Sequence, residues 1–404
     1  MISANAIVIA ARRTAIGKLG GLHKSRGLDD LAAPVIRAVL ADAHFDPADI
    51  GEVIIGNAAG GGGNPARLIA LAAGLPQTTP ALSLDRQCAS GLDAVITAAR
   101  LIATGGAQAV LAGGAESPST APWRVEKPPN LYGHLPRFFA QAAFTPLGID
   151  DPGMIQAAEN VASEFAISRE RQDDFALQSH RRAVAAQRSG LLTDEIVALA
   201  SGQHESQDEG PRSSLTAKLL ARMPPLLSDG TVTAGNSCTI NDGAAIALLV
   251  SPELHRRLGS PPGLALLGAA SAGIAPRILG MAAVPALRVA CARASISPAD
   301  LTAIELNEAF AAQVLATADA LSLDLVRLNV NGGALAFGHP YGASGAILVT
   351  RLFSRLVRNH TGSARGPVAA MIAAAGGLGV AAILQPTQGG SAKYRKLNIS
   401  PPQT

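Results

Sequence analysis

Residues 85–95 read Asp85-Arg86-Gln87-Cys88-Ala89-Ser90-Gly91-Leu92-Asp93-Ala94-Val95, and the rest of the chain can be organised around them. The apolar residues 80–84 predict a strand before this stretch, and the run 92–103 predicts a buried helix after it. Cys88 would then lie on a tight turn at the N-terminus of the helix, where the partial positive charge favours thiolate over thiol. The turn therefore indicates a cysteine nucleophile. The alternative is a buried structural cysteine that acts as a small apolar side chain.

Composition excludes several classes of protein. The 404 residues allow two or three domains and a large core. No apolar run is long enough for a membrane span, residues 1–11 lack the features of a secretory signal, and residues 400–404 are no retention or peroxisomal address. A net charge of +3 with scattered basic residues and 3% aromatics argues against a nucleic-acid partner. We expect a soluble, cytoplasmic protein that binds neither nucleic acid nor membrane.

The three cysteines, Cys88, Cys238 and Cys291, stand far apart in the sequence. Their odd number and wide spacing argue against a disulfide framework and against a zinc or other metal site. Cys291 lies in the apolar helical run 286–294, and we expect it in the core.

The first part of the chain alternates strand and helix patterns. Strands are predicted at 6–10, 49–55 and 80–84, and helices at 31–43, 66–73 and 92–103. The loop Gly60-Gly61-Gly62-Gly63-Asn64-Pro65 precedes the second of these helices. It lacks the spacing of a dinucleotide or P-loop fingerprint. A tight turn that brings backbone near an active site is the first interpretation, and a phosphate cradle is the alternative.

An internal repeat relates the two ends of the chain. Residues 45–50, Phe45-Asp46-Pro47-Ala48-Asp49-Ile50, are echoed 251 residues later by Ile296-Ser297-Pro298-Ala299-Asp300-Leu301, and similar strand patterns follow both copies. The same offset carries Cys88 onto His339, which lies in a second glycine-rich turn before the helical run 346–357. The repeat predicts two similar α/β halves related by a pseudo-twofold axis, with Cys88 and His339 on equivalent loops that face each other.

A region of different composition separates the halves. It contains a long proline-rich and basic loop, polar helices and a charged loop. This composition is typical of an inserted lid that selects the substrate. The predicted boundaries are an N-terminal half at 1–117, an inserted loop domain at 118–241, a return to the first half at 242–262, a C-terminal half at 263–385 and a tail at 386–404.

Five motifs in this order resemble those of the thiolases, the acetyl-CoA acetyltransferases and 3-ketoacyl-CoA thiolases. The resemblance runs from residue 9 to residue 379. The motifs are the turn around Cys88, Ala157-Ala158-Glu159-Asn160-Val161-Ala162, residues 230–245, Glu305-Leu306-Asn307-Glu308-Ala309-Phe310-Ala311, and Gly338-His339-Pro340. Each motif alone is weakly specific, and their combination identifies the family.

The resemblance implies an α/β fold of two duplicated α-β-α-β-α halves with mixed five-stranded sheets and an inserted loop domain, assembled as a homodimer or homotetramer. It also implies that Cys88 takes an acyl group from an acyl-CoA and that His339 holds Cys88 as thiolate and contributes to an oxyanion hole. Asn307 would position a water that completes this hole, and the backbone N–H groups of Cys88 and Ala375 would form a second one. The substrate is a coenzyme A thioester, and no cofactor is implied.

The sequence departs from the family pattern at several positions. Thiolases carry a second cysteine near the C-terminus that transfers the proton at the α-carbon or at incoming CoA, and here Ala373 stands in its place. Loss of a general acid–base lowers a rate by about 10²–10⁴-fold. Cys238 replaces a serine that contacts pantetheine, and Gly153, before Met154, replaces a histidine of some members. Arg212 is either a contact for the adenine or phosphate of CoA or an exposed solvated arginine.

Three hypotheses for function remain open from the sequence. The chain is an acyltransferase whose acceptor needs no α-proton abstraction, or a conventional thiolase in which another residue or water replaces the cysteine, or a non-catalytic acyl-CoA-binding subunit that completes a partner enzyme. The presence of Cys88, Asn307 and His339 together argues against the third.

Overall fold

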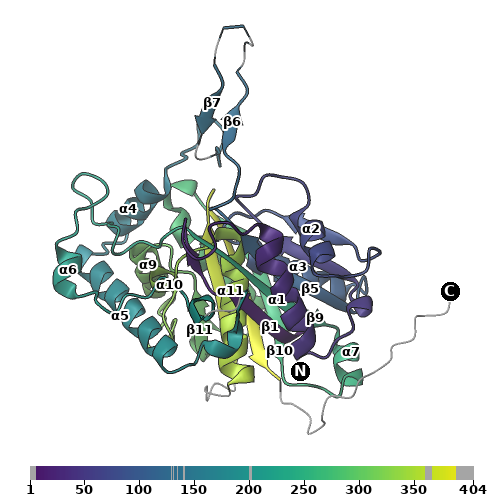
Figure 1. The fold of residues 1–404 in the computed structure, drawn as a ribbon. Helices are drawn as coiled ribbons and strands as arrows, with labels where there is room; N and C mark the ends of the chain where they lie inside the picture. The colour runs from purple at the N-terminus through teal and green to yellow at the C-terminus, as the bar shows by residue number, and fades with distance from the viewer. Residues whose placement is uncertain are drawn as a thin grey trace.

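The computed structural model describes residues 6–128, 130, 132–133, 135–139, 142–199, 203–359 and 366–387. They form two similar α/β halves, and long inserted segments separate the last two strands of the first half (Figure 1). Most of the predicted tail, 386–404, lies outside the described residues.

The first half alternates strands and helices as the sequence predicts. Its strands are β1 (Ile7–Thr14), β3 (Glu52–Gly56), β4 (Ala81–Leu84), β5 (Ala109–Glu116) and β9 (Asn241–Val250). Its helices are α1 (Leu28–Asp42), α2 (Pro65–Ala72) and α3 (Ser90–Ala103). The helices begin earlier than the apolar pattern indicates because their first turns are polar or small residues. In α2, for example, Asn64 caps the helix by accepting a hydrogen bond from the Arg67 N–H, and Pro65 follows it.

The second half repeats this arrangement. Its elements are β10 (Leu264–Gly273), α8 (Ala283–Arg293), β11 (Ala303–Leu306), α9 (Ala311–Leu321), α10 (Ala334–Phe337), α11 (Tyr341–Phe353), β12 (Val368–Ala374) and β13 (Leu378–Pro386). The predicted start of the last helix at residue 346 is wrong, because α11 begins at Tyr341. Residues 342–345 are small and buried against the first half, and this tertiary packing overrides the low helix propensity of glycine.

The strand order confirms the duplication. The first half has the order β4-β3-β5-β9-β1, and the second half has the equivalent order β11-β12-β13-β10. Strands β1 and β10 pair antiparallel through Ile7–Ala265 and Val8–Leu264, so the two predicted sheets are joined edge to edge.

The outer edge of the second half differs from the predicted five strands. The position equivalent to β4 holds only a bridge between Ile304 and Leu328. The side-chain amide of Asn329 makes both hydrogen bonds to the Leu306 backbone, at 2.9 and 2.8 Å, that a further strand would supply. A side chain therefore replaces a strand neighbour at this edge.

Helices α3 and α11 pack against each other between the halves, and glycines let them approach closely. A Cβ on Gly91 would lie 2.5 Å from the Gly342 carbonyl oxygen, and one on Gly345 would lie 2.4 Å from the Leu92 nitrogen. Such backbone contacts leave no room for a side chain. This crossing brings the N-terminal turns of both helices, and hence Cys88 and His339, to the same side of the molecule.

Gly91→Ala is therefore expected to lower the free energy of unfolding by about 1–3 kcal/mol, because the added methyl group must displace the backbone of α11. Urea denaturation measures the change. Gly273→Ala is the matched control, because Gly273 is exposed and a Cβ there would meet only the Gly377 carbonyl oxygen, at 4.0 Å. Equal losses in the two variants would contradict the close-packing argument.

The inserted segments lie between the ends of β5 and β9. They include a hairpin of β6 (Arg124–Glu126) and β7 (Arg137–Phe139), which stands out from the body in Figure 1. They also include α4 (Met154–Glu164), α5 (Arg169–Arg188), β8 (Ile196–Val197) and α6 (Ala217–Ala221). Among the described residues, no helix is both long and apolar enough to cross a membrane.

Candidate active site

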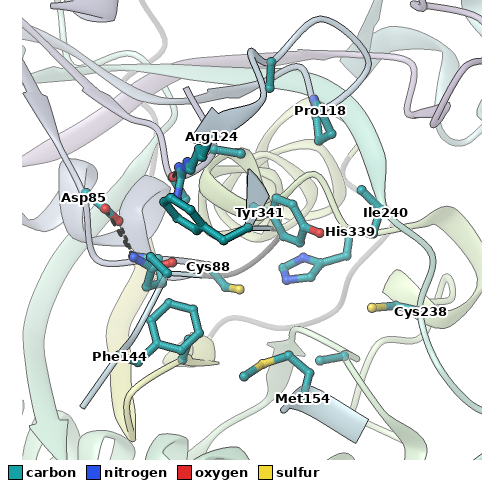
Figure 2. Close-up of a pocket in the computed structure, with 18 of the residues that line it drawn as sticks. Asp85, Cys88, Pro118, Arg124, Phe144, Met154, Cys238, Ile240, His339 and Tyr341 are labelled. Atoms are coloured by element: carbon teal, nitrogen blue, oxygen red, sulfur yellow. Dashed lines mark hydrogen bonds between the residues drawn. The ribbon is translucent and has the colours of Figure 1, made fainter. Parts of the chain in front are cut away.

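A cavity of about 970 Å³ is lined by residues of both halves and of the inserted segments. Five of the predicted site residues line it: Cys88, Met154, Cys238, His339 and Ala375 (Figure 2). The other two, Asn307 and Arg212, are not among the described residues that line the cavity. The structure therefore brings the equivalent loops of the two halves together, as the repeat predicts.

The turn before α3 is built to present Cys88. Gln87 has a positive φ of 50°, and its N–H donates to the Asp85 carboxylate at 2.7 Å. The Ser90 hydroxyl accepts from the Arg86 N–H at 2.8 Å and donates to the Gln87 carbonyl at 2.6 Å. A strained residue between a strand and a helix lifts the next side chain out of the turn, as in a nucleophile elbow.

The thiol of Cys88 is held in its protonated form in the resting protein. Burial and the negative charge of Glu116 raise its pKa to about 12, although the backbone N–H groups of Cys88 and Ala375 act in the opposite direction. The predicted preference for thiolate is thus wrong for the protein without substrate. Desolvation in the cavity outweighs the helix N-terminus.

His339 is fixed on the opposite wall by its backbone and one ring nitrogen. Its N–H donates to the Thr239 carbonyl at 3.0 Å and to Asn241 Oδ1 at 3.1 Å, and its Nδ1 shares a hydrogen bond of 2.6 Å with the Ser344 hydroxyl. Burial lowers its pKa to about 4, so the imidazole is neutral at pH 7. Its Nε2 is buried and has no hydrogen-bond partner within the described residues.

Asn307 is buried and directly follows β11. Its backbone N–H donates to the Met371 carbonyl at 3.1 Å, and its side-chain Nδ2 is a second buried nitrogen without a partner in the described part of the chain. The loop 237–240 connects the two regions, because the Cys238 N–H donates to the Ala309 carbonyl at 2.9 Å and the Thr239 carbonyl accepts from His339. Cys238 is thereby held between the motifs that carry Asn307 and His339.

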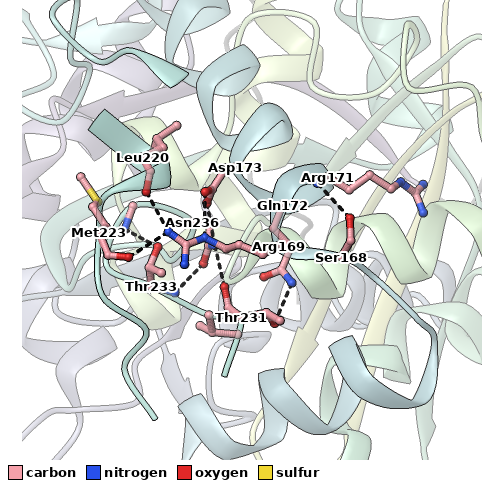
Figure 3. A network of polar contacts seen from close by, with 12 residues as sticks. Ser168, Arg169, Arg171, Gln172, Asp173, Leu220, Met223, Thr231, Thr233 and Asn236 are labelled. Carbon is pink, nitrogen blue, oxygen red and sulfur yellow. Dashed lines mark hydrogen bonds and ion pairs between the residues drawn. The ribbon is translucent and has the colours of Figure 1, made fainter. Parts of the chain in front are cut away.

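A polar network holds the loop that carries Cys238 (Figure 3). Asn236 Nδ2 donates to Asp173 Oδ1 at 2.9 Å, and Asp173 Oδ2 accepts from Arg169 Nε at 2.7 Å. Glu159 accepts from the N–H groups of Thr231 and Val232 at 2.7 and 2.6 Å. The motifs at 157–162 and 230–245 thus fix the wall of the cavity from behind.

Models of the two halves of one enzyme family match almost the whole chain. The model described as the thiolase N-terminal domain matches residues 6–253, and that of the thiolase C-terminal domain matches residues 262–386. The chain belongs to the thiolase family. As a member of this family it is an acyltransferase.

Individual thiolases resemble the chain over most of its length. A putative acetyl-CoA C-acetyltransferase, VraB, of Staphylococcus epidermidis is 44% identical over 349 residues, which are 86% of this chain and 91% of that protein. The crystal structure of Bacillus anthracis acetyl-CoA acetyltransferase superposes with a TM-score of 0.88 at 34% identity and covers 95% of this chain and 99% of that one. Human mitochondrial 3-ketoacyl-CoA thiolase gives a TM-score of 0.84 at 33% identity, with the same coverage.

Ala373, which is predicted to stand in place of the second thiolase cysteine, lies on strand β12. Ala373 pairs with Gly379 of β13 and is not among the described residues that line the cavity. Arg212 is exposed, and its backbone N–H donates to His180 Nδ1 at 3.1 Å. Its contact with the adenine or phosphate of CoA stays a prediction, as does the alternative of a solvated arginine. Among the described residues, no group of three His, Cys, Asp or Glu side chains could hold a metal ion.

Two residues that the sequence analysis missed act on Cys88 or contact His339. Glu116 ends β5 and accepts four hydrogen bonds of 2.7–3.0 Å, from the Asn57 side chain and from the N–H groups of Ala58, Ala59 and Gly342. An acidic residue at the carboxyl end of a buried strand was the available signal. Burial raises its pKa to about 7. Tyr341 lines the cavity and meets the His339 ring edge to face, at 5.5 Å and 84°.

The rate of Cys88 alkylation by iodoacetamide is expected to rise about tenfold per pH unit from pH 7 to pH 10 without a plateau. The reason is that a thiol with a pKa of about 12 remains mostly protonated throughout this range, so its thiolate fraction grows with each unit. Peptide mass spectrometry of the alkylated protein measures the rate, with the unfolded chain as reference. A plateau below pH 9 would show that the resting site already stabilises the thiolate.

Proposed function

We propose that this thiolase-family protein is an acyl-CoA acyltransferase in which Cys88 carries the acyl group and passes it to CoA, acetyl-CoA or another acceptor. The observation that carries the proposal is that backbone N–H groups and a neutral imidazole share one cavity with a thiol. The N–H groups of Cys88 and Ala375 lie close enough to lower the pKa of that thiol, and His339 has a buried Nε2 that has no partner in the described residues and can take a proton. Donors preset around a nucleophile suit the oxyanions of acyl transfer.

The first half-reaction moves one proton and one acyl group. The sulfur of Cys88 attacks the thioester carbonyl, and the thiol proton passes to His339 Nε2. Collapse of the tetrahedral intermediate then breaks the bond between the carbonyl carbon and the CoA sulfur. The CoA sulfur takes the proton from His339 as it leaves. Cys88 and His339 are both neutral at rest, so proton transfer accompanies attack rather than preceding it. In the second half-reaction the acceptor attacks the acyl-cysteine, and its proton returns to the sulfur of Cys88.

We infer that the preferred acceptor needs no α-proton abstraction by a second cysteine. The alanine at 373 has no transferable proton, so an electron-rich carbon, an amine or a carrier thiol suits the second half-reaction better than acetyl-CoA. A conventional thiolase remains the second candidate, because Cys238 and the Tyr341 phenol both line the cavity and both carry a proton at neutral pH, with pKa values raised by burial.

Exchange of the acetyl-CoA methyl protons in deuterated water separates the two candidates. The native protein is expected to promote almost no exchange, whereas Ala373→Cys introduces a thiol at the position predicted for the acid–base cysteine and is expected to raise the exchange rate by about 10²-fold or more. NMR of the acetyl methyl group measures both. If the native protein exchanged the methyl protons as fast as Cys88 is acylated, the chemistry would instead be that of a conventional thiolase. The variants Tyr341→Phe and Cys238→Ala would then identify the group that transfers the proton.

The acyl-enzyme itself is tested by the intact mass of the protein after incubation with a panel of acyl-CoAs. A mass increase equal to the acyl group supports the first half-reaction, and its persistence in the presence of free CoA indicates an unconventional acceptor. The absence of an adduct with every acyl-CoA would contradict the proposal. The chain would then be a non-catalytic or partner-dependent acyl-CoA-binding subunit.

We further propose that the protein works in the cytoplasm as a homodimer or homotetramer and uses no cofactor besides the CoA thioester. Large side chains between β6 and β7, away from the cavity lining, are exposed in the single chain, Tyr132 by 100% and Leu135 by 90%, and an assembly would cover such groups. Light scattering after gel filtration gives the oligomeric state. A monomer at micromolar concentration would contradict this part of the proposal.

A further inference from the structure

Aromatic side chains are concentrated around the Cys88 cavity. The whole chain has only one Trp, three Tyr and nine Phe. Six of them line this one cavity: Trp123, Phe138, Phe139, Phe144, Phe310 and Tyr341. Almost half of the aromatic side chains of a 404-residue protein therefore line the cavity that holds its candidate nucleophile. The general packing of this alanine- and glycine-rich chain does not require them there.

The six rings come from three separate parts of the fold. Trp123, Phe138 and Phe139 belong to the base of the β6–β7 hairpin, and Phe144 follows the hairpin. Figure 2 shows Phe144 beside Cys88. Phe310 and Tyr341 follow Asn307 and His339 in the second half. Convergence from distant segments indicates a built wall rather than one apolar stretch of sequence.

The hairpin rings are arranged for contact with a further ring. Trp123 and Phe138 meet edge to face, with centroids 5.8 Å apart and planes at 89°, and they keep 86% and 65% of their surface exposed. Aromatic rings gain from edge-to-face and offset contacts beyond the area that they bury. An acetyl group on Cys88 would leave most of this surface uncovered.

The remaining wall is mainly apolar. It includes small residues such as Ala58, Ala121 and Ala142. Arg124 and Asp85 are charged residues of the lining, and each makes a hydrogen bond with the protein backbone. Arg124 Nη2 donates to the Ala58 carbonyl at 3.3 Å, and the Asp85 carboxylate accepts from the Gln87 N–H. The cavity thus offers apolar surface and ring edges to an acyl group, and few of its polar groups are left to bind polar substituents on that group.

We propose that the acyl group carried by Cys88 is a bulky, ring-bearing one, so that the acyl donor is an arylacyl thioester of coenzyme A. This inference rests on the proposed function, because it names the substrate class of the same site. A ring suits the wall better than a flexible alkyl chain of equal size, because a rigid group loses less conformational entropy on binding and presents a face to the aromatic edges.

Single-turnover acylation of the full-length native protein tests the substrate class. Phenylacetyl-CoA, cyclohexylacetyl-CoA and octanoyl-CoA carry acyl groups with the same number of carbons and differ in ring and aromatic character, and acetyl-CoA is the small reference. The second-order rate constant for adduct formation, followed by intact mass, is expected to be about tenfold or more higher for phenylacetyl-CoA than for acetyl-CoA. It is also expected to exceed the constants for both other eight-carbon acyl groups.

The outcomes separate this inference from the proposed function. Acylation by acetyl-CoA with equal or slower acylation by phenylacetyl-CoA would overturn the arylacyl assignment and leave the acyltransferase proposal standing. Octanoyl-CoA or cyclohexylacetyl-CoA at or above phenylacetyl-CoA would overturn the aromatic preference. The absence of an adduct with all four thioesters would overturn both.

Variants of the hairpin assign the effect to the aromatic wall. Phe138→Ala and Trp123→Ala are expected to lower the ratio of the phenylacetyl-CoA to the acetyl-CoA rate constant by about fivefold or more. Val125→Ala is the matched control, because Val125 lies on β6 opposite Phe138 and is 48% exposed but is not among the described residues that line the cavity. A changed oligomeric state with an unchanged ratio in the aromatic variants would show that these rings serve assembly, and it would overturn the inference.

Discussion

Replacing Cys88 with alanine is expected to lower the rate of acyl transfer by about 10⁴–10⁶-fold and to abolish the acyl adduct. The expected loss is this large because the covalent route disappears and the surrounding donors are left with only bound substrate and water. The rate of CoA release from the best acyl-CoA, together with the intact mass, measures both effects. The fold should be unchanged, since Cys88 is only partly buried and alanine fits the turn before α3.

The other two cysteines are the controls for this experiment. Cys291 is buried in α8 among core side chains, so Cys291→Ala is expected to retain the adduct and the rate of acyl transfer. Cys238 lines the same cavity as Cys88, and Cys238→Ala should slow transfer without removing the adduct. An adduct of normal size on Cys88→Ala would show that a different residue, Cys238 first among them, carries the acyl group.

Replacing Arg13 with methionine is expected to lower the free energy of unfolding by about 3–5 kcal/mol. Arg13 on β1 is fully buried and joins two carboxylates of the inserted segments. Its Nε donates to Glu195 at 2.8 Å, and its Nη1 and Nη2 donate to Asp208 at 2.6 and 2.9 Å. Both carboxylates are themselves buried, so the variant would leave two negative charges without their cation. The urea midpoint measures the loss.

The neighbouring arginine provides a matched control. Arg12 pairs with Asp42 at 2.6 Å, but the two side chains keep 22% and 28% of their surface exposed. Arg12→Met is expected to cost about 1 kcal/mol or less, because solvent screens the pair. Losses of equal size in the two variants would contradict the assignment of the Arg13 cluster as the connection between the first half and the inserted segments.

The fold was largely predictable from local patterns and from the repeat. The apolar periodicity at 6–10 and 92–103 indicated β1 and α3, and the echo of 45–50 at 296–301 indicated the duplication, because both depend on short-range sequence order. The start of α11 and the missing edge strand of the second half were not predictable. The glycines at 342 and 345 are helical only because α3 packs on them, and Asn329 replaces a strand only because it lies beside Leu306.

The sequence by itself determined the family, the duplicated halves and the chemical identity of the candidate residues, because motif spacing and side-chain chemistry are properties of the chain. The tertiary structure alone decided the protonation of the site. A helix N-terminus predicts a thiolate at Cys88, yet burial and Glu116, brought in from β5, raise the pKa of the thiol to about 12. The tertiary structure also decided that aromatic rings from the hairpin and from the second half line one cavity with that thiol. Desolvation and long-range proximity arise only when distant segments pack together, so neither can be obtained from local sequence.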